Sequence, residues 1–467
     1  MRNLPLFALL ALAACGTDPH AESITRLESE VVKARIFDDE AGPTLEERMQ
    51  QLGVPALSVA VLLDGEIAWA RAWGIADSAS GRAATTETLF QAASISKPVA
   101  ATAMHDMVED GLLTLDGNIN DHLTSWSLPD NAFTRDEKVT LRRITEHSAG
   151  LTVWGFPGYN RDESLPTTAQ VLDGEGNTDS VRVYKTPGES WQYSGGGYTI
   201  MQLAMAEAAN QSFPDILQAR VLEPAGMTSS GYWQPLPERL YDAAATGYRS
   251  SGAVVDGNWH VYPEMAAAGL WTTPSDLLRW SMTIMNDRAG AGTILDSETV
   301  ETMLTKGPGG HGLGPSISED GLKFGHGGAN EGFRCNLMTF QDGRGGIAIM
   351  TNSDSGGTMA YEMLLTAARE YGWEGFEPQR LETTALTDDE VAALVGQYRY
   401  EPGLVTVEHE DGTFRLTSEW DGQYATMVPT SANELHARTD QDRVRLETAD
   451  DGTMTLVWND QWRGIKQ

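Results

Sequence analysis

Apolar residues form strand-like runs at two places far apart in the chain. Residues 54–63 and 66–77 are rich in β-forming side chains and flank Asp64-Gly65, which predicts a β-hairpin. The strand pattern returns much later, over residues 323–333, 335–340 and 346–352. Predicted strands thus precede and follow a helical middle segment of the chain. We therefore predict that the strands from both chain ends form one sheet, in an α/β or α+β layered domain.

The stretch from Ser94 to about Glu109 is apolar on most sides, which is typical of a buried helix. Gly111 ends it, and Pro98 belongs in a first helical turn, where the missing N–H costs nothing. The proline therefore places the start of this helix close to Ser94. Further helices are predicted around residues 201–209 and 275–285.

The pattern changes after a polar stretch around Pro378. Short alternating runs are then joined by Asp-Gly pairs at 411–412 and 451–452, which is typical of an antiparallel sheet or small barrel. This domain lacks a cluster of catalytic residue types, so we expect it to support or shield the first domain. The predicted segments are a signal peptide (1–14), a tether with a short helix as alternative (15–42), the first domain (43–375), a linker (376–386) and a barrel domain (387–467).

The composition indicates a folded globular protein, because 41% of the 467 residues are hydrophobic and 21% are charged. Acidic residues outnumber basic ones by 66 to 33, and the formal net charge is −33. A field of this sign repels nucleic acid and anionic lipid faces, so we expect no nucleic-acid partner.

The N-terminus has one arginine before an apolar run at 4–14, which is of signal-peptide length and too short to span a bilayer. Residues 12–15, LAAC, resemble the lipobox of bacterial lipoproteins, whose cysteine is lipid-modified. The resemblance implies a membrane anchor at Cys15 and a bacterial periplasmic location. Gly16 and Thr17 follow in place of an acidic residue, which permits sorting to the outer membrane. The alternative is an ordinary signal peptide cut one or two residues before the cysteine.

The segment QAASISKPVA places Ser94 three residues before Lys97, and none of the other lysines has a serine at that spacing. A serine hydroxyl is a weak nucleophile until a neighbour accepts its proton. Residues three apart on a helix share a face, and a helix N-terminus favours developing negative charge. A lysine buried there can act as a base. The pair is a candidate nucleophile and base, although the spacing alone is unspecific.

Two later segments carry complementary chemistry. TPGESWQYSGGGY contains Tyr193, which can relay protons between a serine–lysine pair and a substrate when nearby cations favour its ionised form. HGGANEGF contains His326, a donor or cation, beside glycines that let a substrate backbone approach closely. Taken singly, the two also fit a packed aromatic and a loop histidine with satisfied hydrogen bonds.

Together and in this order, the three segments resemble the motif set of the serine β-lactamase and penicillin-binding protein superfamily. The nearest pattern is that of its class C β-lactamase and D-alanyl-D-alanine peptidase-like branch, with S-x-x-K, Y-x-N and then H-x-G or K-T-G. LRRITEHSAGLT, YPEMAAAGLWTTPSDL and FGHGGANEGF resemble its framework segments. The resemblance implies a β-lactamase/transpeptidase-like antiparallel sheet flanked by helices. The C-terminal domain resembles the lipocalin-like barrels that some members append.

The resemblance also implies a role for each motif residue. Ser94 corresponds to the nucleophile that forms the acyl-enzyme, and Lys97 to the base that takes its proton. Tyr193 corresponds to the residue that relays the proton to the leaving group and later activates water. His326 stands near the carboxylate side of the substrate in relatives.

The oxyanion hole is implied in the same way. The backbone N–H groups of Ser94 and Ala329 correspond to its two donors, and Gly328 is the glycine of the H-x-G motif. One such preorganised donor contributes roughly 3–4 kcal/mol in a transition state.

One position departs from the family pattern. The asparagine of Y-x-N, which holds the catalytic lysine and binds the substrate's acylamino group in relatives, is Gly195 here. Glycine can do neither, which favours an esterase or peptidase over an efficient β-lactamase. Lys185-Thr186-Pro187 is not a K-T-G motif, because it precedes Tyr193 and has proline in place of glycine.

Other chemistries lack support. The sequence has no G-x-S-x-G elbow, H-E-x-x-H motif or P-loop, and its nine histidines are scattered, so we expect no metal and no cofactor. Cys335, in the apolar run FRCNLMTF, is interpreted as a buried structural thiol.

The predicted function is that of a cell-envelope serine hydrolase with an acyl-enzyme on Ser94. Its expected small-molecule substrates are esters or D-amino-acid peptides and amides, with weak β-lactam hydrolysis as a side activity. The first alternative is a non-catalytic binding or penicillin-sensing envelope protein on the same fold. The second is an envelope scaffold whose barrel binds a partner through apolar patches.

Overall fold

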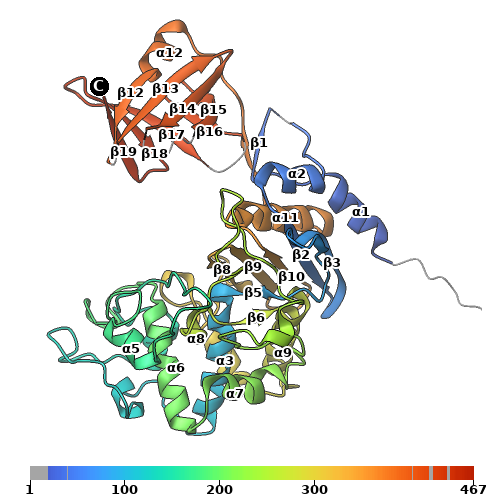
Figure 1. Cartoon of the computed structure of the whole chain (residues 1–467), viewed down its shortest axis with the longest axis vertical. Helices are drawn as coiled ribbons and strands as arrows, with labels where there is room; N and C mark the ends of the chain where they lie inside the picture. The colour runs from blue at the N-terminus through green and yellow to red at the C-terminus, as the bar shows by residue number, and fades with distance from the viewer. Residues whose placement is uncertain (1–18, 39, 402, 420–423, 439–441) are drawn as a thin grey trace, which may run out of the picture.

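The computed structural model describes residues 19–38, 40–401, 403–419, 424–438 and 442–467. The predicted signal peptide and the predicted lipidation site Cys15 lie outside these residues. Figure 1 shows a helix-covered sheet formed by the larger part of the chain and a separate C-terminal barrel. Within the described ranges no helix is both long and apolar enough to span a bilayer.

The first domain is built on a seven-stranded antiparallel sheet in the order β4-β3-β2-β10-β9-β8-β7. The predicted hairpin is confirmed, because Asp64 and Gly65 join β2 to β3 with positive φ angles of 49° and 82°. β2 also pairs with β10, so both ends of the domain meet inside one sheet, as predicted. The strands are β2 (Ala56–Leu63), β3 (Glu66–Asp77), β4 (Arg82–Ala83), β7 (Ser316–Ile317), β8 (Lys323–Asn330), β9 (Phe333–Phe340) and β10 (Gly345–Thr351).

Helices cover both faces of this sheet (Figure 1). Successive residues of β2 alternate between two hydrophobic clusters, with Ala60 in the first and Val59 and Val61 in the second. The first cluster includes residues of α3 (Ser96–Glu109), α6 (Gly195–Ala209), α8 (Met265–Ala268) and α9 (Pro274–Arg288). The second includes residues of α1 (Ala21–Ser29), α2 (Leu45–Leu52) and α11 (Gly356–Tyr371).

Shorter elements complete this domain. Its remaining helices are α4 (Leu141–Thr145), α5 (Thr168–Asp173), α7 (Phe213–Leu217) and α10 (Ser297–Leu304). β5 (Phe90–Gln91) and β6 (Trp271–Thr272) pair with each other beside the start of α3.

Two predicted helix starts differ from those observed. A 3-10 turn, η1 (Ala93–Ile95), holds Ser94, so α3 itself begins two residues later, at Ser96. α6 begins at Gly195, well before the predicted residue 201. Its three leading glycines have low helix propensity, but Ser194 caps them by accepting a 3.0 Å hydrogen bond from the Gly197 N–H.

The tether prediction for 15–42 is incomplete, because the chain is packed from Ala21 onward, where the predicted alternative, a short helix, is present as α1. Ile24 and Leu27 of α1 are buried in the cluster that includes α11. β1 (Arg35–Phe37) then pairs in parallel with β11 (Gln379–Leu381), which lies in the predicted linker. The linker prediction is therefore also incomplete, because a short two-stranded sheet joins its backbone to the N-terminal segment.

The predicted C-terminal barrel is confirmed. β12 to β19 form a closed antiparallel barrel around buried Val405, Phe414 and Leu456, and α12 (Asp388–Leu394) precedes it. The strands are β12 (Gly396–Arg399), β13 (Leu404–Glu410), β14 (Thr413–Ser418), β15 (Tyr424–Ser431), β16 (Glu434–Ala437), β17 (Arg443–Thr448), β18 (Met454–Trp458) and β19 (Trp462–Lys466).

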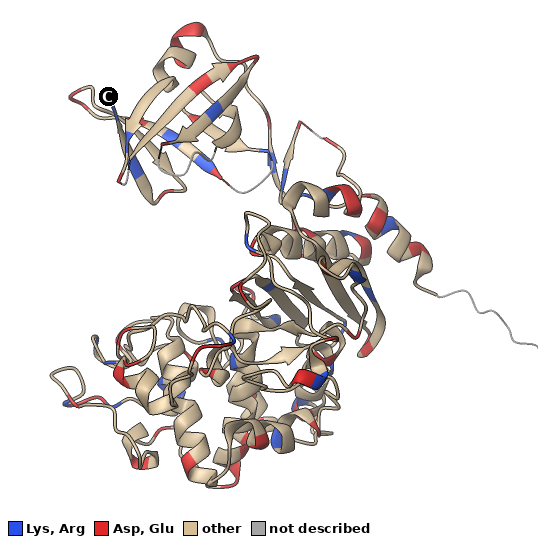
Figure 2. Cartoon of the chain, in the orientation of Figure 1, with Lys and Arg blue, Asp and Glu red and all other residues tan. Residues whose placement is uncertain are grey.

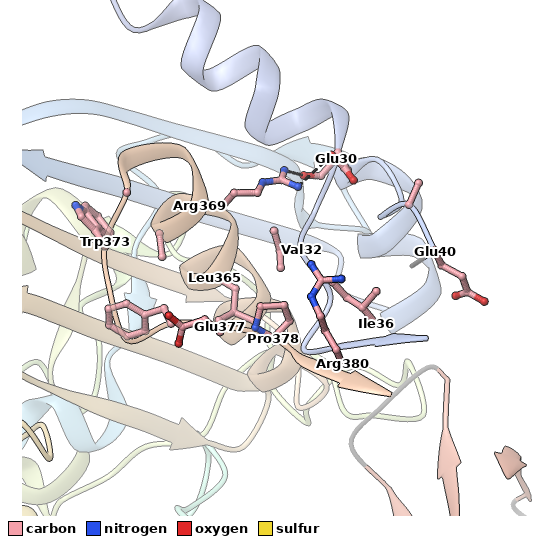
Figure 3. A pocket seen from close by; sticks show the side chains of 14 residues that line it. Glu30, Val32, Ile36, Glu40, Leu365, Arg369, Trp373, Glu377, Pro378 and Arg380 are labelled. Atoms are coloured by element: carbon pink, nitrogen blue, oxygen red, sulfur yellow. Dashed lines mark hydrogen bonds and ion pairs between the residues drawn. The ribbon is translucent and has the colours of Figure 1, made fainter. Parts of the chain in front are cut away.

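A cavity of about 590 Å³ lies between α11 and the segments around β1 and β11 (Figure 3). Val32, Leu365 and Trp373 supply apolar walls. Glu30 and Arg369 form an ion pair of 3.0 Å at its edge. None of the predicted catalytic residues lines this cavity, so it is separate from the predicted site.

Acidic residues occur along both the first domain and the barrel (Figure 2). They include residues of α1 and α2 on the outside of the sheet. Acidic residues are therefore not confined to one of the two domains.

Candidate active site

Ser94 lies in η1, which runs directly into α3. The preceding residue, Ala93, is fully buried and has φ of 49°, a conformation that is unusual for a residue with a side chain. The Ser96 hydroxyl accepts a 2.9 Å hydrogen bond from the Leu270 N–H, which ties the start of α3 to the strand pair of β5 and β6. Ser94 itself is partly exposed, so its hydroxyl lies at the boundary between core and solvent.

Lys97 is brought to the serine by the first turn of α3, as the spacing predicted. Its Nζ lies 3.1 Å from Ser94 Oγ and 2.9 Å from the carbonyl oxygen of Ala267 in α8. The side chain is buried, and among the described residues no carboxylate forms an ion pair with it. Its two contacts hold the amine in one place beside the hydroxyl.

Tyr193 lies just before α6 and faces the same lysine. Lys97 Nζ is 4.9 Å from the centre of the Tyr193 ring and 5.6 Å from that of Tyr198. Ser194 holds the segment through its hydroxyl, which donates to the Thr152 carbonyl oxygen at 2.8 Å. The structure therefore brings Ser94, Lys97 and Tyr193 together from two separate segments of the chain.

β8 places the third motif beside the nucleophile. A Cβ on Gly328 would lie 2.4 Å from the Ala92 carbonyl oxygen and 2.4 Å from Cys335 Sγ, so only glycine permits this close approach to η1. Ala329, whose backbone is predicted to complete the oxyanion hole, follows on the exposed end of β8. The strand end and η1 thus border the same space.

His326 is packed within the site, and of the two expected roles, donor or cation, its surroundings favour the donor. Burial, and then the charge of Lys97, lower the pKa of His326 to about 3. Its Nδ1 lies 2.5 Å from the Gly327 carbonyl oxygen, and its ring centre is 6.2 Å from that of Tyr193. The imidazole is therefore neutral at physiological pH.

Two further histidines belong to this site and were missed from the sequence. His147 stacks on Tyr193 at 4.2 Å between ring centres, and its Nδ1 accepts a 3.2 Å hydrogen bond from the Ser194 N–H. His311 lies 5.0 Å from His147 and 5.8 Å from His326. Burial is the main cause that lowers the pKa of His147 and of His311.

A weak signal existed for only one of these histidines. His147 lies within LRRITEHSAGLT, which resembles a framework segment of the family, and it has a positive φ of 62°. His311 lies in a glycine-rich segment without a recognisable pattern.

The position of the missing asparagine is occupied by a neighbouring loop. A Cβ on Gly195 would lie 2.9 Å from Phe156 Cε2 and 3.2 Å from the Trp154 carbonyl oxygen. The Gly195 N–H also donates to that carbonyl oxygen at 3.1 Å. The Phe156 ring and the Trp154 backbone thus fill the space into which a side chain at residue 195 would project. Trp154 and Trp191, which are 70% and 38% exposed, continue this aromatic surface beside Tyr193.

Cys335 is the buried structural thiol that the sequence predicted. Its Sγ donates to the Ala92 carbonyl oxygen at 3.1 Å, and burial raises its pKa to about 12. A thiol in this state packs β9 against the segment before Ser94. In the part of the chain that the structure describes, no group of three or more His, Cys, Asp or Glu side chains is arranged so that it could hold a metal ion.

Comparisons with known proteins agree with this architecture. The family model "Beta-lactamase" matches residues 43–369. Penicillin-binding protein 4* of Bacillus subtilis is 24% identical over 84% of this chain and 90% of its own length. Esterase EstB of Burkholderia gladioli is 28% identical over 56% of this chain and 67% of its own, and a D-aminopeptidase of Brucella ovis is 26% identical over 70% and 62%.

Solved structures show the same fold. An octameric penicillin-binding protein homologue from Pyrococcus abyssi has a TM-score of 0.63 at 20% identity, over 90% of this chain and 98% of that one. D-amino acid amidase from Ochrobactrum anthropi has a TM-score of 0.56 at 23% identity, over 70% and 98%. With the family match over most of its length, the chain belongs to the Beta-lactamase family of serine hydrolases.

Proposed function

We propose that this protein is a cell-envelope hydrolase that cleaves esters or D-amino-acid amides through an acyl-enzyme on Ser94. The observation that supports it most strongly is the 3.1 Å contact between Ser94 Oγ and Lys97 Nζ. A distance of this size is within reach of direct proton transfer. Relatives named esterase and D-aminopeptidase support the two substrate classes.

In the first step Lys97 acts as the unprotonated amine: the Ser94 oxygen attacks the carbonyl carbon of the substrate while its proton passes to the lone pair of Lys97 Nζ. The backbone N–H groups of Ser94 and Ala329 stabilise the oxyanion of the tetrahedral intermediate. The contact between Lys97 and the Ala267 carbonyl oxygen keeps the amine aimed at the hydroxyl throughout. The intermediate collapses when the leaving group departs.

Tyr193 carries the proton from Lys97 to the leaving group. The lysine amine lies 4.9 Å from the centre of the Tyr193 ring, and the His147 ring packs against it at 4.2 Å between centres. In the second half-reaction the same phenol orients the water that attacks the acyl-enzyme carbonyl. The proton that this water loses passes to the Ser94 oxygen as the ester bond to the enzyme breaks. The Ser194 hydrogen bond to His147 Nδ1 holds the segment during both steps.

The cellular location rests on the lipobox-like sequence at residues 12–15. We place the mature protein in the bacterial periplasm, anchored through a lipid on Cys15 and sorted to the outer membrane. Incorporation of radioactive palmitate into the wild type, and its loss in a Cys15→Ser variant, tests this assignment. A variant that still incorporates label would refute it.

A non-catalytic binding protein is the competing function, and Gly195 is the observation that favours it. A fluorophosphonate probe separates the two. We expect the wild type to be labelled on Ser94, the Ser94→Ala variant to be unlabelled, and the control Ser190→Ala to be labelled like the wild type. A wild type that resists every serine-reactive probe would establish the binding-protein alternative.

A further inference from the structure

The exposed end of β8, which borders Ser94, offers a substrate no charged side chain. Gly327 and Gly328 have no side chain, and Ala329 ends in a methyl group. His326 is the polar side chain of this motif, so the charge that a substrate meets here depends on that imidazole and on the cations around it.

The hydrogen bonds of His326 show which nitrogen carries the proton. A carbonyl oxygen can only accept, so the 2.5 Å contact with the Gly327 oxygen places the proton on Nδ1. Nε2 then carries a lone pair, and it is buried without a hydrogen-bond partner in the described structure. A neutral ring with a lone pair as its second polar atom cannot bind a carboxylate.

The nearest cations are committed to other partners. Lys97 contacts Ser94 and the Ala267 carbonyl oxygen, inside the site. Arg334 stands opposite Ala329 in the β8–β9 register, but its Nη1 lies 2.9 Å from Asp354 Oδ1 and donates to the Asn330 carbonyl oxygen at 2.6 Å.

The adjoining turn adds an acidic group. Glu331 directly follows β8 and pairs with Arg249 at 2.7 Å. The positive charge of Arg249 is neutralised by Glu331, so the turn offers no net positive charge to a substrate carboxylate. Lys185 contacts the side chain of Gln192, next to Tyr193 in the sequence, at 3.3 Å.

The part of the site around Tyr193 is aromatic. Phe156 fills the space beside Gly195, and Trp154 and Trp191 flank Tyr193 with much of their surface exposed. Apolar groups gain free energy by leaving water for such a surface, whereas an ionised group loses hydration there.

We propose that the site selects uncharged esters and amides with an apolar acyl group over substrates that carry a carboxylate beside the scissile bond. This inference rests on the proposed hydrolase function and narrows it. It makes β-lactams and peptides with a free C-terminal carboxylate poor substrates, because each presents a carboxylate to the end of β8. His326 is the residue that determines this specificity.

Two esters with the same acyl group test the proposal, phenyl phenylacetate and 3-carboxyphenyl phenylacetate. For each, kcat/KM is divided by the rate of hydroxide-catalysed hydrolysis, which corrects for the leaving group. We expect the wild type to favour the neutral ester by about tenfold or more, a ratio that corresponds to 1.4 kcal/mol. An equal or greater value for the carboxylate ester would overturn the proposal.

The His326→Lys variant restores a cation at this position and should reduce the ratio at least severalfold, whereas the uncharged control His326→Gln should retain it. If both variants lower the ratio equally, charge at residue 326 is not the cause, and the assignment to His326 fails. The wild-type ratio decides the substrate class even if the lysine variant does not fold.

Labelling with a fluorophosphonate separates this inference from the function on which it rests. A protein that is labelled on Ser94 but prefers the carboxylate ester contradicts the inference alone. A protein that is not labelled and hydrolyses neither ester contradicts both.

Discussion

Restoring the family's asparagine at Gly195 should destabilise the protein and fail to create an efficient β-lactamase. The added Cβ would lie 2.9 Å from Phe156 Cε2, closer than real Cβ contacts allow, so the ring or the loop has to move. Overpacking of this kind costs about 1–3 kcal/mol. Replacing glycine at a compatible φ returns about 0.4–1 kcal/mol by restricting the unfolded chain. The difference is a loss of about 1 kcal/mol.

The Gly195→Ala variant measures this steric cost without the amide. Gly357 provides a matched control, because it also lies near a helix N-terminus and a Cβ there meets nothing within 4 Å. We expect Gly357→Ala to be neutral or slightly stabilising in urea unfolding, and Gly195→Ala to lower the midpoint. A second substitution, Phe156→Leu, should recover most of the loss, with a coupling of at least about 0.5 kcal/mol.

Turnover of a chromogenic cephalosporin completes this test. Gly195→Asn alone should leave it near the wild-type value, because Phe156 occupies the space that the amide needs. A Gly195→Ala variant as stable as the wild type, or additive effects with Phe156→Leu, would refute the steric reasoning. A large gain in cephalosporin turnover from Gly195→Asn alone would refute it as well.

Two further predictions concern buried charges. Arg48 and Glu362 form a buried bidentate ion pair of 2.7 and 2.8 Å between α2 and α11. Arg48→Met should therefore lower the free energy of unfolding by about 3–5 kcal/mol, and adding Glu362→Met should recover most of this loss. An Arg48→Met variant as stable as the wild type would contradict the prediction. Glu264 is buried with both carboxylate oxygens unpartnered, and burial raises its pKa to about 7. The folded state then holds a proton that the unfolded state releases above about pH 4.5, so this group lowers stability as pH rises from about 4.5 to 7. Glu264→Gln should therefore stabilise the protein at pH 8 and change little at pH 4.5 in urea titrations; an equal effect at both pH values would exclude ionisation as the cause.

Local patterns in the sequence were sufficient where short-range chemistry decides the structure. Asp64-Gly65 and Asp411-Gly412 adopt the positive φ angles that a tight hairpin needs, and both hairpins were predicted. The Ser94–Lys97 contact follows from one helical turn and was predicted in the same way.

Features that depend on tertiary packing were not readable from the sequence. α1 is a short polar helix whose Ile24 and Leu27 become buried only against α11, more than three hundred residues later, so its stability comes from that contact. Likewise, nothing near Gly195 in the sequence shows that Phe156 takes the place of an asparagine side chain.

The histidines of the site show the same limit. His311 and His326 meet His147 and Tyr193 only because three loops and β8 converge, and burial is the main cause that lowers the pKa of each. The motif identified His326 but not its charge, which depends on neighbours that sequence spacing does not reveal.

The rate of acyl-enzyme formation in a Lys97→Ala variant tests the central claim most directly. Stopped-flow measurement of the p-nitrophenol burst from a p-nitrophenyl ester gives this rate, and Lys185→Ala serves as the matched control, since Lys185 contacts Gln192 and not Ser94. We expect acylation to fall by about 10²–10⁴ in Lys97→Ala and to stay within about twofold of the wild type in the control. Acylation within a few-fold of the wild type in Lys97→Ala would contradict the account, because the amine 3.1 Å from the hydroxyl would then not be its base.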